Sequence, residues 1–164
     1  MTTPPSEGSA TAARNETVFA TPSECELVIT RTFEAPRRLV WMAFTDPKHL
    51  PNWQPERATM PVCEIDLRTG GTWRFVYRLA NGREHDVRGT YREVDPPTRF
   101  VQVQMVDGEE NTTTSTFTEE NGRTTVTSVH RYASTASRDR ALQYAKFGTA
   151  SGYTRLDAYL PSMH

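Results

Sequence analysis

Three histidines, His49, His85 and His130, are the side chains best suited to metal or proton chemistry in this sequence. No two of them have the spacing of a ligand pair on a helix face, so the sequence predicts no metal site. A histidine inside an apolar cavity titrates near neutral pH and can carry a proton, while tyrosine hydroxyls orient a substrate carbonyl. His130 is the first candidate for this role and His85 the second, although an inert structural role is the simpler interpretation of both.

The sequence carries no reaction signature. Cys25 and Cys63 lie far apart, without the spacing of a redox dithiol or a zinc site. The pair Gly70-Gly71 lacks the lysine and the following helix of a phosphate loop, and no serine sits in a nucleophile elbow. The sequence therefore predicts no catalytic residue and no cofactor, and an enzyme is the less favoured class.

Charge and hydropathy further narrow the possible partners and location of the protein. The chain has 19 basic and 20 acidic side chains, a net charge of -1, which argues against a nucleic-acid partner. No stretch reaches the roughly 20 apolar residues of a membrane span, and residues 1–23 lack the apolar core of a signal peptide. We expect a cytoplasmic protein with a flexible N-terminal segment over residues 1–23 and a single domain over residues 24–164.

The elements that position these side chains follow from the pattern of the domain. A β-branched run ending at Pro36 predicts a strand, and "RRLVWMAFTD" and "KHLPNW" predict two short helices in tandem. Turns of the Asn-Gly and Asp-Gly kind then separate six predicted strands, which must be antiparallel because their connections are short. These strands cover residues 62–68, 72–79, 84–94, 99–106, 112–118 and 123–132. A helix from Ser137 to about Leu160 completes the chain, with Gly148 as a position where it could break.

This order of elements is carried by "ITRTFEAPRRLVWMAFTDPKHLPNWQP", "DLRTGGTWRF", "VRGTYREVDPPTRF" and "GYTRLDAYL". With these motifs the chain resembles the START-related (SRPBCC) superfamily, and within it the AHSA-like branch named for activators of the heat-shock-protein-90 ATPase. The resemblance implies an α+β helix-grip fold, like that of the birch-pollen allergen. In that fold a curved antiparallel sheet of about seven strands wraps around the C-terminal helix and leaves a hydrophobic cavity.

The sequence itself leaves open whether that space is a packed core or a cavity. The strand over residues 72–79 alternates a face of Trp73, Phe75 and Tyr77 with a second face, bearing Arg74, Val76 and Arg78, that we expect to be solvated. The final helix offers mostly small side chains to the sheet, so large residues on one layer could simply fill the space left by the other. The polar members of the predicted inner face favour a ligand site, and the resemblance favours it further. The candidate cavity residues are Trp53, Trp73, Phe75, Tyr77, His85, Tyr91, Ser128, His130, Tyr132, Gly152 and Leu156.

Three functions remain as alternatives. The leading interpretation is a binding protein for an apolar or aromatic small molecule, lipid-like or polyketide-like. The second is a chaperone partner that stimulates a heat-shock-protein-90-type ATPase, which only the resemblance implies. The third is a cyclase or hydrolase that uses a cavity histidine and tyrosine. A homodimer formed through an exposed strand edge is a further expectation about partners.

Overall fold

A computed structural model describes residues 15–163. Eight antiparallel strands form one sheet in the order β1-β2-β8-β7-β6-β5-β4-β3. Their bounds are β1 Val18–Ala20, β2 Glu26–Phe33, β3 Thr59–Ile65, β4 Thr72–Arg78, β5 Glu84–Asp95, β6 Arg99–Val106, β7 Glu109–Glu120 and β8 Arg123–Arg131. The six strands expected after Pro61 are all present, because the turn residues that separate them have the backbone conformation that tight hairpins need: Asn121 and Gly122 both have positive φ.

The helices account for the rest of the described chain. Helix α2 (Arg37–Thr45) and the 3₁₀ helix η1 (Leu50–Trp53) follow β2 in tandem, and the long helix α3 (Thr135–Tyr159) is followed by a short 3₁₀ turn, η2 (Leu160–Ser162). Helix α3 runs without a break through Gly148 and begins two residues earlier than expected. Ser134 caps its first turn, since its hydroxyl accepts a hydrogen bond from the amide of Ser137.

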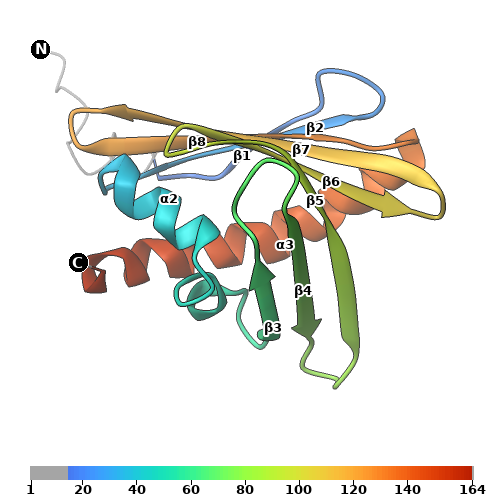
Figure 1. The fold of residues 1–164 in the computed structure, drawn as a ribbon, viewed down its shortest axis with the longest axis horizontal. Helices are drawn as coiled ribbons and strands as arrows, with labels where there is room; N and C mark the ends of the chain where they lie inside the picture. Colours follow the sequence, from blue (N-terminus) through green and yellow to red (C-terminus); the bar gives the residue numbers. More distant parts are fainter. Residues whose placement is uncertain (1–14, 164) are drawn as a thin grey trace, which may run out of the picture.

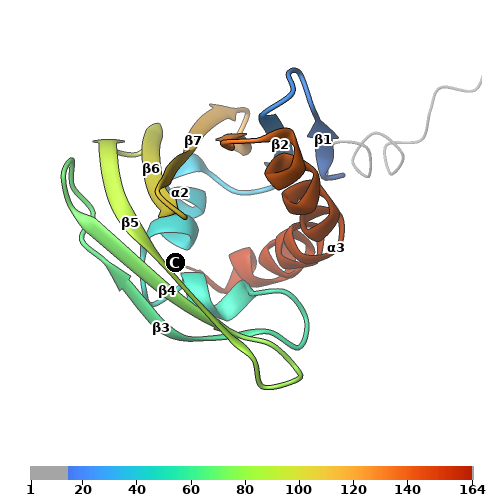
Figure 2. The ribbon, with the colours of Figure 1, turned by 90° about the vertical axis from the view of Figure 1, so that its right-hand side faces the viewer.

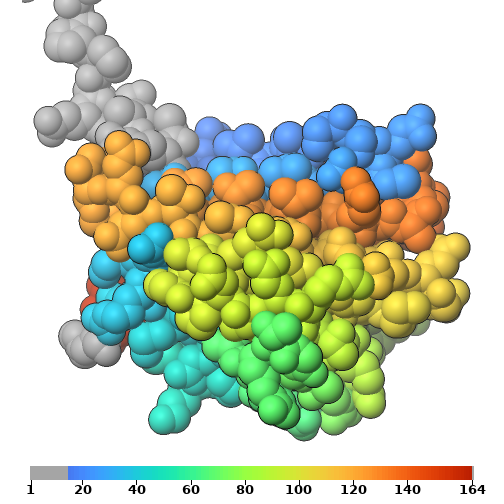
Figure 3. Space-filling view, turned by 45° about the horizontal axis from the view of Figure 1, so that its top comes forward, coloured from blue at the N-terminus to red at the C-terminus, as the bar shows by residue number. Residues whose placement is uncertain are grey.

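The sheet curves around one side of α3, as predicted for a helix-grip fold. Figure 1 shows α3 running lengthwise beside the sheet. Viewed nearly along α3, the strands form an arc whose open side is occupied by that helix, with α2 inside the arc (Figure 2). The outer face of the sheet presents its strands in order as a continuous surface, from blue β2 through orange β8 to green β4 (Figure 3). The domain therefore has two layers, the sheet and the helices. A functional site must lie between the sheet and α3 or on the outer face of the sheet.

Two sequence expectations need correction. The first concerns the segment expected to be flexible: Val18–Ala20, within it, pairs with β2 and adds an eighth strand to the expected sheet, as a three-residue strand too short to leave a period-2 signal. Residues 1–14 lie outside the described part. Strand β2 is therefore not an edge; β1 and β3 are the edges, and their pairing with a second copy stays a prediction.

The second correction concerns the outer face of β4, which is not fully solvated. Val76 is only 6% exposed. It lies between Arg74 and Arg78 on the same face of the strand, and these arginines are held by ion pairs with Asp86 and Glu84 on β5. The aliphatic stems of paired arginines cover apolar neighbours, which explains the burial of a valine on a charged face.

Candidate ligand cavity

A cavity lies between the sheet and the middle of α3, from Ala141 to Tyr153. It consists of two adjoining lobes with volumes of about 430 and 570 Å³, in the size range of small-molecule sites. The lobes are continuous, because nine residues line both: Ile29, Phe75, Tyr77, Val87, Gln102, Thr113, His130, Tyr144 and Thr149. Strands β2 and β4 to β8 and helix α3 all contribute to this shared lining.

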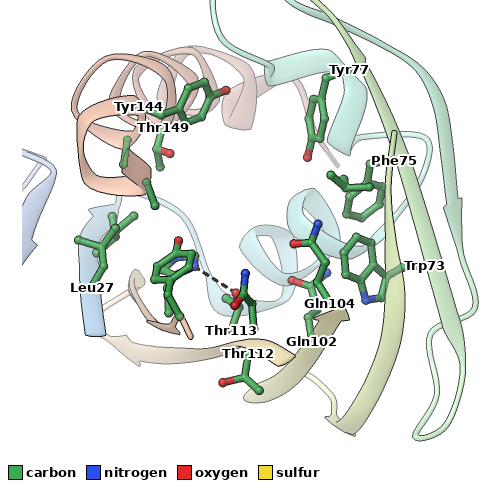
Figure 4. Close-up of a pocket in the computed structure, with 17 residues that line it drawn as sticks. Leu27, Trp73, Phe75, Tyr77, Gln102, Gln104, Thr112, Thr113, Tyr144 and Thr149 are labelled. Carbon is green, nitrogen blue, oxygen red and sulfur yellow. Dashed lines mark hydrogen bonds between the residues drawn. The ribbon is translucent and has the colours of Figure 1, made fainter. Parts of the chain in front are cut away.

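One wall of the cavity is aromatic and comes from β4. Trp73, Phe75 and Tyr77 follow one another along the inner face of the strand, with ring centroids 5.1 and 6.3 Å apart. Figure 4 shows the three rings along one side of the open space, with the Tyr77 hydroxyl directed into it. The indole of Trp73 donates a hydrogen bond to the carbonyl of Thr90 (3.1 Å). Its ring lies against the bare backbone of Gly89, where a Cβ would be 2.7 Å from the ring.

A second wall, beside the aromatic one, is polar and comes from β6, β7 and β8. The register places Gln102, Thr113 and His130 side by side in one row across these strands, and Gln104 opposite Asn111 in the next. The Thr113 hydroxyl is 3.1 Å from His130 Nδ1. This band occupies the concave face, where a packed domain would have apolar side chains, so it is the feature that most clearly separates a site from a core.

The serines at the inner end of the polar wall pair with each other. Ser115 and Ser128 face each other across β7 and β8, and their hydroxyl oxygens are 3.0 Å apart. Both are buried, so this pair satisfies its own polar groups in the protein.

His130 is neutral at physiological pH. Burial lowers its pKa to about 4, since desolvation penalises the charged imidazolium. Its ring lies nearly parallel to that of Tyr132, at 6.3 Å and 10°. Burial also raises the pKa of Tyr132, to about 12, and raises that of Tyr77. At pH 7 the neutral ring can accept a hydrogen bond, but it is a weak base and cannot serve as a general acid.

Nine of the eleven residues expected in the cavity line it. His85 does so from an exposed position at the rim, and Gly152 from the helix, where its Cα leaves room for the backbone of Trp53 and for Pro55. Tyr91 and Leu156 are instead fully packed core residues. Tyr91 packs against Phe100 at a centroid distance of 6.0 Å, and its backbone is bonded to the turn at Gly70-Gly71. The nine are Trp53, Trp73, Phe75, Tyr77, His85, Ser128, His130, Tyr132 and Gly152.

His49, the remaining histidine weighed for chemistry, lies outside this lining. Its Nδ1 is 2.7 Å from the hydroxyl of Tyr159, which ties the loop after α2 to the end of α3. Within residues 15–163 no group of three histidine, cysteine or acidic side chains is placed to hold a metal ion. In the same part of the chain no helix is long and apolar enough to cross a membrane.

The lining from β6 and β7 and the α3 side chain Tyr144 were not expected from the sequence. In β6 the alternation reads as though Val101 and Val103 faced the core and Gln102 faced solvent. Both valines are indeed buried, but on the outer face of the sheet, while Phe100 and the glutamine face inward. Phe100 was the available signal, because a strand that places an aromatic inside must also place every second residue after it inside.

The comparisons with known proteins agree with this geometry. A family model described as "Activator of Hsp90 ATPase homolog 1-like protein" matches residues 34–161. No protein in the curated set matches the sequence. The crystal structure of a protein from Rhodobacter sphaeroides has a TM-score of 0.82 at 27% identity, covering 90% of this chain and 100% of that one. One from Mycobacterium smegmatis has a TM-score of 0.74 at 27% identity, with 90% and 100% covered.

A third similar structure carries the family in its name. The solution structure of an AHSA1-like protein from Aeromonas hydrophila has a TM-score of 0.66 at 23% identity, covering 84% of this chain and 97% of that one, and it supports the fold alone. Together with the family match, these structures confirm the resemblance inferred from the sequence motifs.

Proposed function

The chain belongs to the family of Activator of Hsp90 ATPase homolog 1-like proteins, and we propose that it acts as a binding protein for an apolar or aromatic small molecule. The molecule would lie against β4 and the polar wall, under the middle of α3. One observation carries this proposal: a continuous space of small-molecule size is bordered by an aromatic wall and a band of polar side chains.

The helix that covers the cavity supports the same conclusion. Ala141 and Ala145 are the α3 residues placed over the first lobe, together with Tyr144 and Thr149. Tyr144 is 58% exposed, so it stands at the rim rather than filling the interior. Figure 4 shows Tyr144 and Thr149 on the opposite side of the space from Trp73. Small side chains on the helix leave room that the side chains of the sheet do not take up.

A cavity-filling variant tests the proposal. Ala145→Leu would extend a buried side chain into the first lobe, whereas Ala158→Leu adds the same atoms at an exposed position of α3. A library of aromatic small molecules would be screened by thermal shift. We expect ligands that raise the melting temperature of the wild type and of Ala158→Leu but not of Ala145→Leu. A library without stabilisers, or stabilisers that act equally on all three proteins, would contradict the proposal.

The family description supplies a second candidate, stimulation of a chaperone ATPase. The matched residues, 34–161, contain the helices and all strands except β1 and β2. Any such activity would therefore reside in the helix-grip domain itself. The test is the ATP turnover of an Hsp90-type chaperone at saturating concentrations of this protein. An increase that survives in Ala145→Leu would favour the chaperone role over ligand binding, and unchanged turnover would dispose of it.

A further inference from the structure

The cavity carries no formal charge on its walls. In the part of the chain that the structure describes, neither lobe is lined by an aspartate, glutamate, lysine or arginine. Arg31 of β2 forms an ion pair with Asp157 of α3, and neither residue lines the cavity. The paired charges around Arg74 and Asp86 lie on the opposite, outer face of the sheet.

Burial favours the uncharged form of the histidine and tyrosines that line the interior of the cavity. They come from every layer around it: His130 and Tyr132 from β8 and the residue after it, Tyr77 from β4, and Tyr144 and Tyr153 from α3. His85 is a further titratable side chain, exposed at the rim. Burial depresses the pKa of His130 and raises the pKa of each of these tyrosines. A carboxylate or ammonium group brought into this space would lose its hydration without meeting an opposite charge, which is costly.

The polar wall sets a second requirement. Gln102 and Gln104 each carry an amide with two donors and an acceptor, and Thr113 and His130 add a hydroxyl and a ring nitrogen. Figure 4 shows Gln102, Gln104 and Thr113 grouped on one side of the space, next to Trp73 and Phe75. A purely apolar ligand would separate these groups from water without replacing their hydrogen bonds. A ligand with neutral donors or acceptors on that edge would replace them.

Resting on the proposed binding function, we propose that the cavity selects uncharged aromatic molecules that carry neutral hydroxyl, carbonyl or amide groups along the edge facing β6 to β8. Their ring faces would lie against Trp73 and Phe75, and their polar edge would meet Gln102, Gln104 and Thr113. Carboxylates and amines of the same shape would be rejected. The discrimination comes from the walls as a whole, since the described lining contains no aspartate, glutamate, lysine or arginine to attract or repel a charged group.

Three pyrene derivatives of nearly the same shape separate these requirements. 1-Pyrenemethanol is uncharged with one polar group, 1-pyrenecarboxylate is ionised at pH 7, and 1-methylpyrene is apolar. Binding would be measured at pH 7 by fluorescence titration, with Trp73 as a donor in the wall. We expect 1-pyrenemethanol to bind at least about tenfold more tightly than 1-pyrenecarboxylate, because of the desolvation cost of the charge. We expect it also to bind more tightly than 1-methylpyrene.

A matched pair of variants locates the polar requirement. Gln102→Met removes one amide from the wall at nearly constant volume, and Gln143→Met makes the same change at an exposed position of α3 outside the lining. The preference for 1-pyrenemethanol over 1-methylpyrene should fall severalfold in Gln102→Met and persist in Gln143→Met. In a third variant, Gln104→Lys, the new charge should raise the affinity for 1-pyrenecarboxylate relative to 1-pyrenemethanol. Circular dichroism and thermal unfolding would verify that each variant is folded.

The outcomes distinguish this inference from the function on which it rests. Preference for the alcohol in the wild type, reduced by Gln102→Met alone, supports the inference. Equal or tighter binding of the carboxylate or of 1-methylpyrene overturns it while leaving a binding function intact. If the wild type binds none of the three probes and the thermal-shift library also yields no ligand, both the inference and the binding function fall.

Discussion

The two ends of the space inside the sheet differ in how they are filled, although the same sheet and the same helix bound both. At the end near α2, aromatic rings interlock: Phe117 contacts Trp41 and Phe44 at centroid distances of 5.2 and 5.4 Å, and Phe33 contacts Tyr153 at 5.5 Å. At the other end the rings of β4 face an open space. The first end is a packed core, and the second is the cavity.

The difference comes from the helices rather than from the sheet. Helix α2 and η1 lie inside the arc at the packed end and bring Trp41, Phe44 and Trp53 between the sheet and α3 (Figure 2). Their polar groups are satisfied locally, since the indole of Trp53 donates to the carbonyl of Ala43 at 2.9 Å. The second lobe borders this packed end, since Phe44, Leu50 and Trp53 line it, whereas among the helices only α3, with Ala141 and Ala145, covers the first lobe. The first lobe therefore lies where no inserted helix supplies bulk.

Truncating an aromatic at each end should give the largest contrast. Phe117→Ala removes a fully buried ring from the packed end and should lower the free energy of unfolding by about 4 kcal/mol. Phe75→Ala should cost about 2 kcal/mol, because its ring already borders empty space and makes fewer contacts. Urea unfolding measures both losses, provided that the dependence of the unfolding free energy on urea concentration is the same in all proteins. Equal losses would mean that the cavity end is as well packed as the core.

The next largest effect is expected at Gly89, on the cavity side of β5. A Cβ at this position would meet the carbonyl oxygen of Val103 at 1.8 Å and the ring of Trp73 at 2.7 Å. Because one of these contacts is with backbone, Gly89→Ala should cost about 3 kcal/mol, which lowers the melting temperature by roughly 8 °C. Adding Trp73→Phe should recover little of the loss. A melting temperature close to that of the wild type would contradict the close approach of β5 to β6.

The pH dependence of stability should also distinguish the two ends, because the cavity end holds His130, whose pKa is lowered by desolvation. The pKa of His130 is about 4 in the folded protein and about 6.5 in the unfolded chain. Between these values the unfolded state binds more protons, so the contribution of His130 is complete above pH 6.5 and is lost as the pH falls toward 4. Since cavity solvent reaches the ring, we expect a loss of about 2 kcal/mol, below the roughly 3 kcal/mol of a fully dry site.

The measurement is urea unfolding at pH 4.5 and pH 7 for the wild type and for His130→Gln. The variant should lose less stability than the wild type over this interval. The cavity tyrosines do not contribute, because burial moves their pKa values upward, away from it. Parallel losses in the two proteins would show that His130 is well solvated when folded.

The smallest effect on stability is expected at Gly148, on the rim. A Cβ there would lie 2.5 Å from the ring of Tyr144, but that ring is the free end of an exposed side chain and can move. The gain in helix propensity offsets this displacement, so Gly148→Ala should change the free energy of unfolding by less than about 0.5 kcal/mol. Moving the ring off the rim should speed the association of 1-pyrenemethanol. In a Tyr144→Ala background the glycine substitution should have no further effect on that rate.

Much of the fold could be predicted because its signals are local. Turn residues such as Asn81-Gly82 and Asn121-Gly122 mark hairpins within four residues of sequence, and the observed strands begin or end beside them. The inward alternation of β4 and β8 was also readable, which is why Trp73 and His130 were expected in the lining. The inward face of β6 could not be identified in the same way. Its valines are buried on the outer face of the sheet, and that burial depends on tertiary packing.

The sequence by itself determined the order of the elements from β2 to α3 and the aromatic face of β4, since each depends on residues close together along the chain. The helix-grip fold followed from the resemblance of its motifs to a family, which the family match confirms. Only the tertiary structure decided where that face is packed and where it is open. Whether Tyr91 or Tyr77 borders empty space depends on how far α2 and η1 reach beneath the sheet. That reach depends on contacts between residues distant in sequence, which alternation and propensity do not encode.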